Sequence, residues 1–376
     1  MILQQPAAAP VGCYIHVPFC RSKCPYCDFY ALRTGDAQQA AYAAAIARRL
    51  REAAAAGWRW SSVYIGGGTP SALELPALRQ ILEAARVSRS NPASEFTVEC
   101  NPGDVTQELC ALLAAQGVNR VSLGLQSAVE AERRALGRRS GAAQLRLAVE
   151  RLHAAGVENI SLDVMLGVPH QTQASLGETL AFCAELGAAH ISAYLLKLEP
   201  GTPFARKPPP GLPEEDAQCE LYLAACAWLA QNGYAQYEIA NFCRPGRASA
   251  HNLLYWNAEP YFALGPGAHG FTGGRRWLYA RDLDGFLAGA APTQDGTGGD
   301  FAEYAMLRLR LTEGLREDLL LSRFGHGIPA AMRRAAESLE PHGLLRTEPG
   351  KITLTREGFL LSNRVIGALL GEVLNK

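Results

Sequence analysis

The chain has 376 residues, of which 48% are hydrophobic, and its 36 basic residues balance its 36 acidic residues. A chain of this length buries a substantial core in about two domains, and its net charge near zero gives no footprint for nucleic acid. The N-terminus lacks a basic segment followed by an apolar one, and no apolar run is long enough to span a bilayer, so we expect a soluble cytoplasmic protein.

Short β-rich runs alternate with Ala- and Leu-rich segments of helical period, which is typical of βα units that build a parallel sheet. The six predicted strands are Gly12–Val17, Ser61–Ile65, Glu95–Glu99, Arg120–Leu123, Asn159–Met165 and His190–Leu195. A complete (β/α)₈ barrel needs about 250 residues, and here the repeat fades near Glu199. The sequence therefore predicts an α/β fold containing a partial (β/α)₆ barrel with an open side.

Three regions are predicted along the chain: residues 1–212 form the barrel, 213–295 close it, and 296–376 form a small C-terminal domain. Six prolines among residues 200–213 should interrupt regular structure near the first boundary. A helix is expected from Glu214 to about Ala230.

The rest of the middle region, 233–274, is rich in Gly, Asn and aromatic residues without clear periodicity, so we expect a loop that lines a site. The Gly-, Thr- and Asp-rich segment 290–300 is expected to be a second linker. The C-terminal domain should be α+β and winged-helix-like, with helices and one β-like patch at Lys351–Leu354.

Three of the ten cysteines lie close together, as Cys20, Cys24 and Cys27, with the spacing C-x₃-C-x₂-C. They follow the first predicted strand, and active sites of barrels collect in such loops. This pattern fits a thiolate metal site in a reducing compartment better than disulfides, and it leaves one coordination position free. A structural zinc site would need a fourth ligand. Cys13 is available, but its place inside the strand favours a buried residue.

The run CRSKCPYCDF resembles the cluster motif of the radical SAM superfamily, whose members have a complete or partial (β/α) barrel. The resemblance implies a [4Fe-4S] cluster held by Cys20, Cys24 and Cys27, with S-adenosylmethionine (SAM) on the unligated iron. In that family an electron passed into the sulfonium cleaves a C–S bond and gives a 5′-deoxyadenosyl radical. The cofactors supply this chemistry, and the protein positions and shields them.

Glycine and polar residues recur at the ends of the predicted strands. The turn GGGTP follows the second strand and could offer backbone N–H groups to a carboxylate or carbonyls to an amine. A helix cap or a buried hydrogen bond would explain any one of the polar residues, such as Glu99 or Asp163. The resemblance implies that SAM is contacted by Tyr14, Tyr26, Gly67, Gly68, Thr69, Glu99, Gln126, Arg138 and Asp163. Some of these contact a second SAM in coproporphyrinogen oxidases, and His16 matches a supporting histidine near the cluster.

Nearly the whole chain resembles the oxygen-independent coproporphyrinogen III oxidase branch, through YIHVPFCRSKCPYCDF, GGGTPS, ECNP, LGLQS, DVMLGVPHQT and LTREGFLLSN. True oxidases have Gly-Cys after the third cluster cysteine, where this chain has Asp28 and Phe29, and they have a longer N-terminal extension. Residues 251–256, HNLLYW, match the HNxxYW motif of the heme chaperone (HemW) group within this branch. One departure is Ser140, where many relatives have histidine.

The resemblance to the heme chaperone group implies a protein that binds heme and transfers it to respiratory-chain hemoproteins. His251 would offer a neutral imidazole nitrogen to heme iron, and Asn252 would fix the orientation of that ring. Tyr255 and Trp256 would stack on the macrocycle. The alternative, with about even odds, is that His251 is hydrogen-bonded internally and the aromatic residues are core.

Second-choice heme ligands are His269 and Cys243. Besides heme, the expected partners are acceptor apo-hemoproteins, an electron donor for the cluster and, transiently, membrane proteins, with the chain as a monomer or a cluster-dependent dimer. SAM cleavage is an open expectation, whereas coproporphyrinogen turnover is not expected. The competing hypotheses are an oxidase that decarboxylates coproporphyrinogen III and, less favoured, a heme-degrading methyltransferase. Nucleic acid is not expected, because acids are interleaved with the basic residues of the tail, Arg308, Arg310, Arg333 and Arg334.

Overall fold

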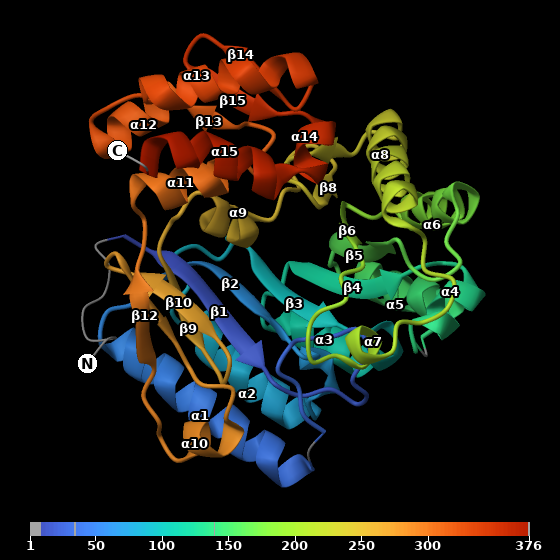
Figure 1. The fold of residues 1–376 in the computed structure, drawn as a ribbon. Helices are drawn as coiled ribbons and strands as arrows, with labels where there is room; N and C mark the ends of the chain where they lie inside the picture. Colours follow the sequence, from blue (N-terminus) through green and yellow to red (C-terminus); the bar gives the residue numbers. More distant parts are fainter. Residues whose placement is uncertain (1–8, 34, 139, 375–376) are drawn as a thin grey trace.

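The computed structural model describes residues 9–33, 35–138 and 140–374. Six parallel strands form the centre of its main sheet (Figure 1): β1 (Val11–Val17), β2 (Trp60–Gly67), β3 (Phe96–Cys100), β4 (Arg120–Gln126), β5 (Asn159–Leu166) and β6 (His190–Leu195). The predicted strands are confirmed. The largest difference is at the end of β4, expected at Leu123 and observed at Gln126. The protein has the α/β fold of a partial (β/α)₆ barrel.

Helices connect these strands and cover the outside of the sheet (Figure 1). They are α1 (Asp36–Ala55), α2 (Leu75–Arg86), α3 (Gln107–Ala115), α4 (Glu130–Ala135), α5 (Ala142–Ala154) and α6 (Gln173–Glu185), with 3₁₀ turns η1 (Pro70–Ala72) and η2 (Pro102–Asp104). The turn GGGTP leads into η1, and α2 begins only at Leu75. Pro76 in the first turn favours that start. The N–H groups of a first helical turn have no partner within the helix, and proline has no N–H to leave unpaired.

The region between barrel and C-terminal domain contains more regular structure than predicted. Its elements are α7 (Pro203–Arg206), α8 (Glu215–Gln231), β7 (Ala235–Gln236), β8 (Asn241–Cys243), α9 (Ala250–Trp256), β9 (Tyr261–Leu264), β10 (His269–Thr272), β11 (Arg275–Leu278), α10 (Leu283–Leu287) and β12 (Thr293–Thr297). The helix α8 is as predicted. The loop expected over 233–274 and the linker expected over 290–300 are wrong, because both hold strands. These strands have two to five residues, too few to show a period, and pairing with the barrel stabilises them.

The added strands extend both edges of the barrel within the described part of the chain. The sheet has 12 strands in the order β12-β11-β10-β9-β1-β2-β3-β4-β5-β6-β8-β7. Strand β9 runs parallel to β1, whereas β8 runs antiparallel to β6. The ring centroid of Phe262 on β9 lies 5.1 Å from that of Trp58 and 5.2 Å from that of Trp60, and all three side chains are buried. Burial of each such side chain is worth about 2–3 kcal/mol, so β9 is part of the barrel core.

The C-terminal domain packs above α9 (Figure 1). Its elements are α11 (Phe301–Arg308), β13 (Leu315–Arg316), α12 (Glu317–Phe324), α13 (Ala330–Leu339), η3 (Glu340–His342), β14 (Leu345–Glu348), β15 (Lys351–Leu354), α14 (Arg356–Leu360) and α15 (Ser362–Leu374). The predicted patch Lys351–Leu354 coincides with β15, which lies between β13 and β14 in a three-stranded sheet. A helical unit with a small β-wing is therefore confirmed, while the exact domain boundaries stay predictions.

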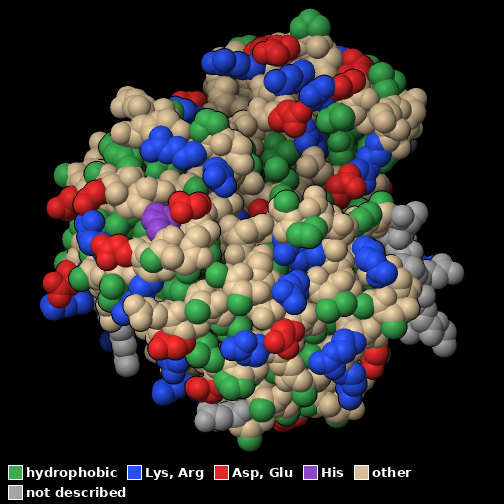
Figure 2. All heavy atoms as spheres, turned by 180° about the vertical axis from the view of Figure 1, so that it is seen from behind, with side chains coloured by type: hydrophobic (Ala, Val, Ile, Leu, Met, Phe, Trp, Pro, Cys, Tyr) green, Lys and Arg blue, Asp and Glu red, His purple; other side chains and the backbone are tan. Residues whose placement is uncertain are grey.

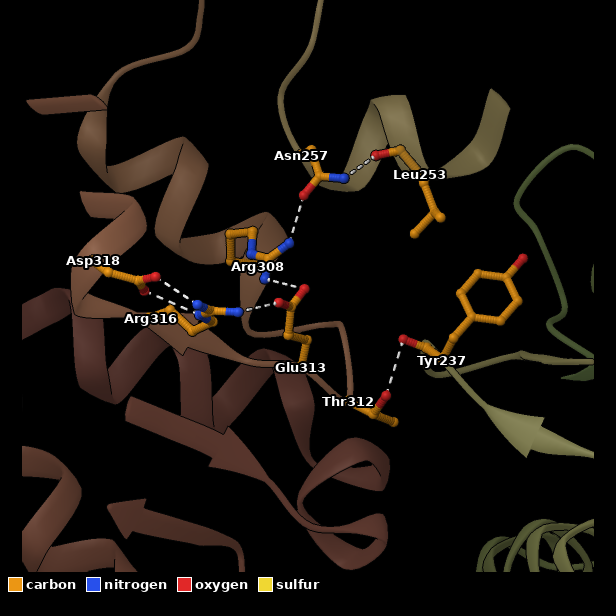
Figure 3. A network of polar contacts seen from close by, with 8 residues as sticks. All are labelled: Tyr237, Leu253, Asn257, Arg308, Thr312, Glu313, Arg316 and Asp318. Atoms are coloured by element: carbon orange, nitrogen blue, oxygen red, sulfur yellow. Dashed lines mark hydrogen bonds and ion pairs between the residues drawn. The ribbon is translucent and has the colours of Figure 1, made fainter. Parts of the chain in front are cut away.

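A polar network joins this domain to α9 (Figure 3). Arg308 of α11 is only 2% exposed and donates to Asn257 Oδ1, just after α9, at 2.5 Å and to Glu313 Oε2 at 2.7 Å. The Thr312 hydroxyl donates to the Tyr237 carbonyl at 3.3 Å, which ties the domain to the edge of the barrel sheet. Arg308 is thus a buried charge with two polar partners at this junction.

Charges of both signs are mixed on the surface. Figure 2 shows Lys and Arg side chains interspersed with Asp and Glu on one face of the molecule. In the C-terminal domain Arg333 pairs with Glu317, and Arg310 donates to Asn363 Oδ1 at 2.8 Å. Arg308, Arg310 and Arg333 of the tail therefore have internal partners. No helix in the part of the chain described is both long and apolar enough to cross a membrane.

Candidate functional site

A cavity of about 180 Å³ opens at the carboxyl ends of the barrel strands. Loops after parallel strands meet at this end of the sheet, which is why residues from distant segments share the cavity. Every residue predicted to hold the cluster or SAM lines it, apart from Tyr14. The lining set includes Cys20, Cys24, Cys27, Tyr26, Gly67, Gly68, Thr69, Glu99, Gln126, Arg138 and Asp163.

The three cysteines come from one partly exposed loop after β1. Cys20 Sγ lies 3.3 Å from Thr69 Oγ1, and the Arg138 guanidinium lies 3.6 Å from Cys24 Sγ. Among the described residues no three His, Cys, Asp or Glu side chains converge as they would on a single metal ion. A zinc ion needs its thiolates at about 2.3 Å, whereas each thiolate of a [4Fe-4S] cluster binds its own iron. Three thiols spread around one cavity wall therefore fit a cluster better than zinc.

The glycine turn after β2 is required by close packing. A Cβ on Gly68 would lie 2.6 Å from the Phe19 carbonyl oxygen, and one on Gly66 would lie 2.7 Å from Glu99 Cδ. The N–H of Gly68 donates to the Val17 carbonyl at 2.8 Å, and that of Gly67 to Glu99 Oε2 at 3.1 Å. These two N–H groups are therefore engaged within the protein and are not available to a carboxylate of a ligand.

Two half-buried carboxyl groups face the cavity. Glu99 Oε1 accepts a hydrogen bond from the Tyr64 hydroxyl at 2.7 Å, and burial raises its pKa to about 7. Burial also raises the pKa of Asp163, whose Oδ1 accepts from the Ser122 hydroxyl at 3.2 Å. Carboxyl groups with raised pKa values in a cavity are frequent at functional sites. Both retain oxygen lone pairs for hydroxyl or amine donors of a ligand.

Gln126 is held in an unusual backbone conformation at the end of β4. Its φ is +69°, which costs a non-glycine residue about 1 kcal/mol, and the pairing of β4 with β5 shifts register beside it. Such a bulge redirects a side chain, and here the Gln126 amide oxygen accepts from the Tyr194 hydroxyl at 3.1 Å. Arg138 reaches the same edge and donates to the Gly124 carbonyl at 2.7 Å. The strain at Gln126 indicates a position shaped for a ligand.

Comparison with known proteins agrees with this geometry. Residues 14–183 match the radical SAM superfamily. The chain is 33% identical to heme chaperone HemW of Bacillus subtilis, over 96% of this chain and 99% of that protein. It is 35% identical to heme chaperone HemW of Mycobacterium tuberculosis, over 96% of this chain and 95% of that protein. The chain belongs to the HemW family.

A solved structure supports the fold of this HemW-family chain. Coproporphyrinogen III oxidase from Escherichia coli, a radical SAM enzyme, is 21% identical and superposes with a TM-score of 0.82 over 96% of this chain and 90% of that one. At this identity the similarity establishes the fold, including the C-terminal domain. Membership of the radical SAM superfamily implies a [4Fe-4S] cluster and SAM, and the cavity residues fit both groups.

The HNxxYW motif of the HemW-family chain lies in and around α9, away from the cavity. His251 is 0% exposed, with Nδ1 2.8 Å from the Ser62 hydroxyl and Nε2 2.8 Å from the Tyr255 hydroxyl. Burial lowers the pKa of His251 to about 3, so the ring is neutral. Both ring nitrogens are thus engaged, as in the internal alternative that the sequence left open. In this conformation His251 has no nitrogen to offer to iron, and its role as a heme ligand stays a prediction.

The remaining motif residues lie on the same helix as His251, whereas the second-choice ligands lie on separate strands. Asn252 and Trp256 are half-buried on α9. Cys243 is buried in β8, whereas His269 is exposed on β10 with Nδ1 3.8 Å from Asp295 Oδ2. The assignment of these residues to heme stays a prediction.

Two other predicted residues support the glycine turn without lining the cavity. The Tyr14 hydroxyl is 2.9 Å from His16 Nδ1, and His16 Nε2 donates to the Tyr30 carbonyl at 3.0 Å. Because the carbonyl can only accept, His16 carries its proton on Nε2 and accepts from Tyr14. Its ring lies against Gly67, where a Cβ would come within 2.6 Å. This placement agrees with a supporting position for His16.

Several cavity residues were missed from the sequence, namely Ser22, Lys23, Phe29, Cys100, Asn101, Ser122, Gly124 and Tyr194. Tyr194 carries a usable signal, since it lies near the end of the sixth predicted strand, as Glu99 does in the third. Phe29 is 62% exposed beside Cys27, where the sequence departs from the oxidases. Ser140 donates to Asn101 Oδ1 at 3.2 Å, so the position that departs from relatives supports the cavity wall.

Proposed function

We propose that this chain is a heme chaperone that binds heme and transfers it to respiratory-chain hemoproteins, on a radical SAM scaffold. The similarity to HemW proteins carries this proposal, because it extends over 96% of the chain and so includes the HNxxYW motif and the C-terminal domain. A likeness limited to the cluster site would support only the superfamily.

Within the proposed scaffold, Cys20, Cys24 and Cys27 would hold the [4Fe-4S] cluster, and SAM would occupy the cavity beside it. The cluster, when reduced by an electron donor, supplies the electron for SAM chemistry. Glu99, whose carboxyl group faces the cavity, would accept hydrogen bonds from the ribose hydroxyls. The carbonyls of the glycine turn would accept the methionyl amine.

The second candidate function is oxidation of coproporphyrinogen III, favoured by the shared fold with the Escherichia coli oxidase. The residues after Cys27 argue against it. Asp28 Oδ2 lies 3.6 Å from the Arg281 guanidinium, and Phe29 is exposed at the cavity mouth, where the oxidases have Gly-Cys. An ion pair and an aromatic ring thus replace a small residue and a thiol.

The deciding experiment reconstitutes the cluster anaerobically, titrates ferric heme by visible spectroscopy, and measures turnover of coproporphyrinogen III with SAM and a reductant in parallel. We expect saturable one-to-one heme binding without formation of protoporphyrinogen. Turnover without stable heme binding would assign the chain to the oxidases instead.

The same titration tests His251 as the iron ligand. Since both ring nitrogens are engaged internally, we expect His251→Ala to bind heme with an unchanged visible spectrum. A shifted spectrum with weakened binding would show that the motif rearranges and that His251 reaches the iron.

A further inference from the structure

Two buried histidines in the protein have hydrogen-bond partners of the same kinds, one serine hydroxyl and one tyrosine hydroxyl each. His251 lies between the hydroxyls of Ser62 and Tyr255, each at 2.8 Å. His190 of β6 lies between the hydroxyls of Ser161, at 2.8 Å, and Tyr237, at 2.9 Å. Both side chains are 0% exposed. Hydrogen bonding within the core therefore explains the two histidines equally well, and any difference in role must come from their other neighbours.

The difference is the ring against which His251 packs. Tyr64 of β2 stacks on His251 with ring centroids 5.3 Å apart and an angle of 29° between the planes. The Tyr64 hydroxyl then donates to Glu99 Oε1 at 2.7 Å, and Glu99 Oε2 accepts from the Gly67 N–H at 3.1 Å. A continuous set of contacts thus runs from α9 to the glycine turn of the cavity. His190 packs against Tyr237 instead, with ring centroids 5.7 Å apart.

Glycines at both ends of these contacts leave little room for movement. A Cβ on Gly12 would lie 2.5 Å from Leu254 Cδ1 and 3.2 Å from His251 Cε1, so α9 sits directly on the β1 backbone. At the other end, a Cβ on Gly66 would lie within 2.8 Å of both Glu99 carboxylate oxygens. Close packing transmits small displacements, because protein interiors have few voids to absorb them.

We propose that His251 is a positioning residue for the SAM site: its ring holds Tyr64 in place, and Tyr64 holds the Glu99 carboxyl group toward the ribose of SAM. This inference rests on the proposed SAM cavity, but it does not depend on heme binding. It gives the histidine of the HNxxYW motif a role through Tyr64 and Glu99 rather than on iron. Glu95 supports the arrangement, since its carboxylate accepts from the N–H groups of Ala250 and His251 at the start of α9.

The test measures SAM affinity of the cluster-reconstituted protein by calorimetry in a double-mutant cycle. We expect Tyr64→Phe to weaken SAM binding about fivefold, the factor that corresponds to the roughly 1 kcal/mol of a typical hydrogen bond. His251→Ala should weaken it by a similar factor. The double variant should bind no more weakly than Tyr64→Phe alone, because both changes interrupt the same contacts.

The matched control is His190→Ala, which removes the same ring and the same two hydrogen bonds without touching Tyr64. It should destabilise the fold yet leave SAM affinity within about twofold of wild type, as for independent sites. If His251→Ala does not fold, His251→Gln, which keeps polar atoms near Ser62 and Tyr255, takes its place in the cycle.

Two results would overturn the inference while leaving the SAM site intact: equal effects of His251→Ala and His190→Ala on SAM affinity, or additive losses in the double variant. Absence of SAM binding by the wild-type reconstituted protein would instead reject the proposed SAM site itself. The two failures are therefore distinguishable.

Discussion

The two ends of the barrel use polar residues in opposite ways. At the carboxyl ends of the strands, the thiols, Glu99 and Asp163 line an open cavity and retain unused bonding capacity. At the amino ends, His190 and His251 are fully buried, and each ring nitrogen has a hydroxyl partner. Residue type therefore does not identify a binding group. What distinguishes the two ends is whether the polar atoms are already satisfied within the protein.

The largest effect is expected from a change at the carboxyl ends of the barrel strands, where the cavity opens. Cys24→Ser should abolish the visible absorbance of the reconstituted cluster and its iron content, because a cluster held by three thiolates loses one of them. Cys219→Ser is the matched control, since Cys219 is also partly exposed but lies on α8 away from the cavity. Retention of a full cluster in Cys24→Ser would remove this residue from the proposed ligand set.

The second prediction concerns how Glu99, at the same end of the barrel, makes the free energy of unfolding depend on pH. The Glu99 pKa is raised by burial to about 7, above its ordinary 4.5. Its stabilising contribution is therefore fully present below pH 4.5 and is lost as the pH rises through 7, by up to about 3 kcal/mol. Glu99→Gln cannot ionise, so the free energy of unfolding of the cluster-free protein should vary less between pH 5 and 8, as measured with urea.

The control for this pH profile is Glu130→Gln, because Glu130 lies on the surface beside Arg134. Its profile should follow that of the wild-type chain. A Glu99→Gln profile as steep as wild type would mean that the carboxyl group titrates normally.

The third prediction addresses the other end of the barrel, at the amino ends of the strands, where α9 meets the C-terminal domain. Arg308→Met removes a 2% exposed guanidinium that binds Asn257 and Glu313, so it should lower the free energy of unfolding by about 2 kcal/mol. Heme titration and cluster content should change little. A loss of cluster in this variant would contradict the independence of the two ends.

The smallest effect is expected for Arg316→Met, in the same network of Figure 3. Arg316 pairs with Glu313 and Asp318, but all three side chains are 41% or more exposed. Solvent screens such pairs, so the loss in the same urea experiment should be smaller than that of Arg308→Met. A loss as large as that of Arg308→Met would show that the network acts as one unit.

Much of the carboxyl end of the barrel could be predicted. The run of Cys20, Cys24 and Cys27 is local, and parallel strands bring their carboxyl ends to one edge, so Glu99, Gln126 and Asp163 were placed correctly without coordinates. Tyr14 was the exception in this set. It lies within β1, and its hydroxyl points toward His16.

The sequence by itself determined the (β/α)₆ order, the cluster loop and the boundary helix α8, because period and spacing are local properties of a chain. Only the tertiary structure decided that segments such as Tyr261–Leu264 become strands, since their stability comes from pairing with β1. It also decided the state of His251. Tyr255 is only four residues away, but the other two partners of that ring, Ser62 and Tyr64, lie nearly two hundred residues away along the chain. Burial and hydrogen-bond satisfaction depend on such distant contacts, and no local pattern reports them.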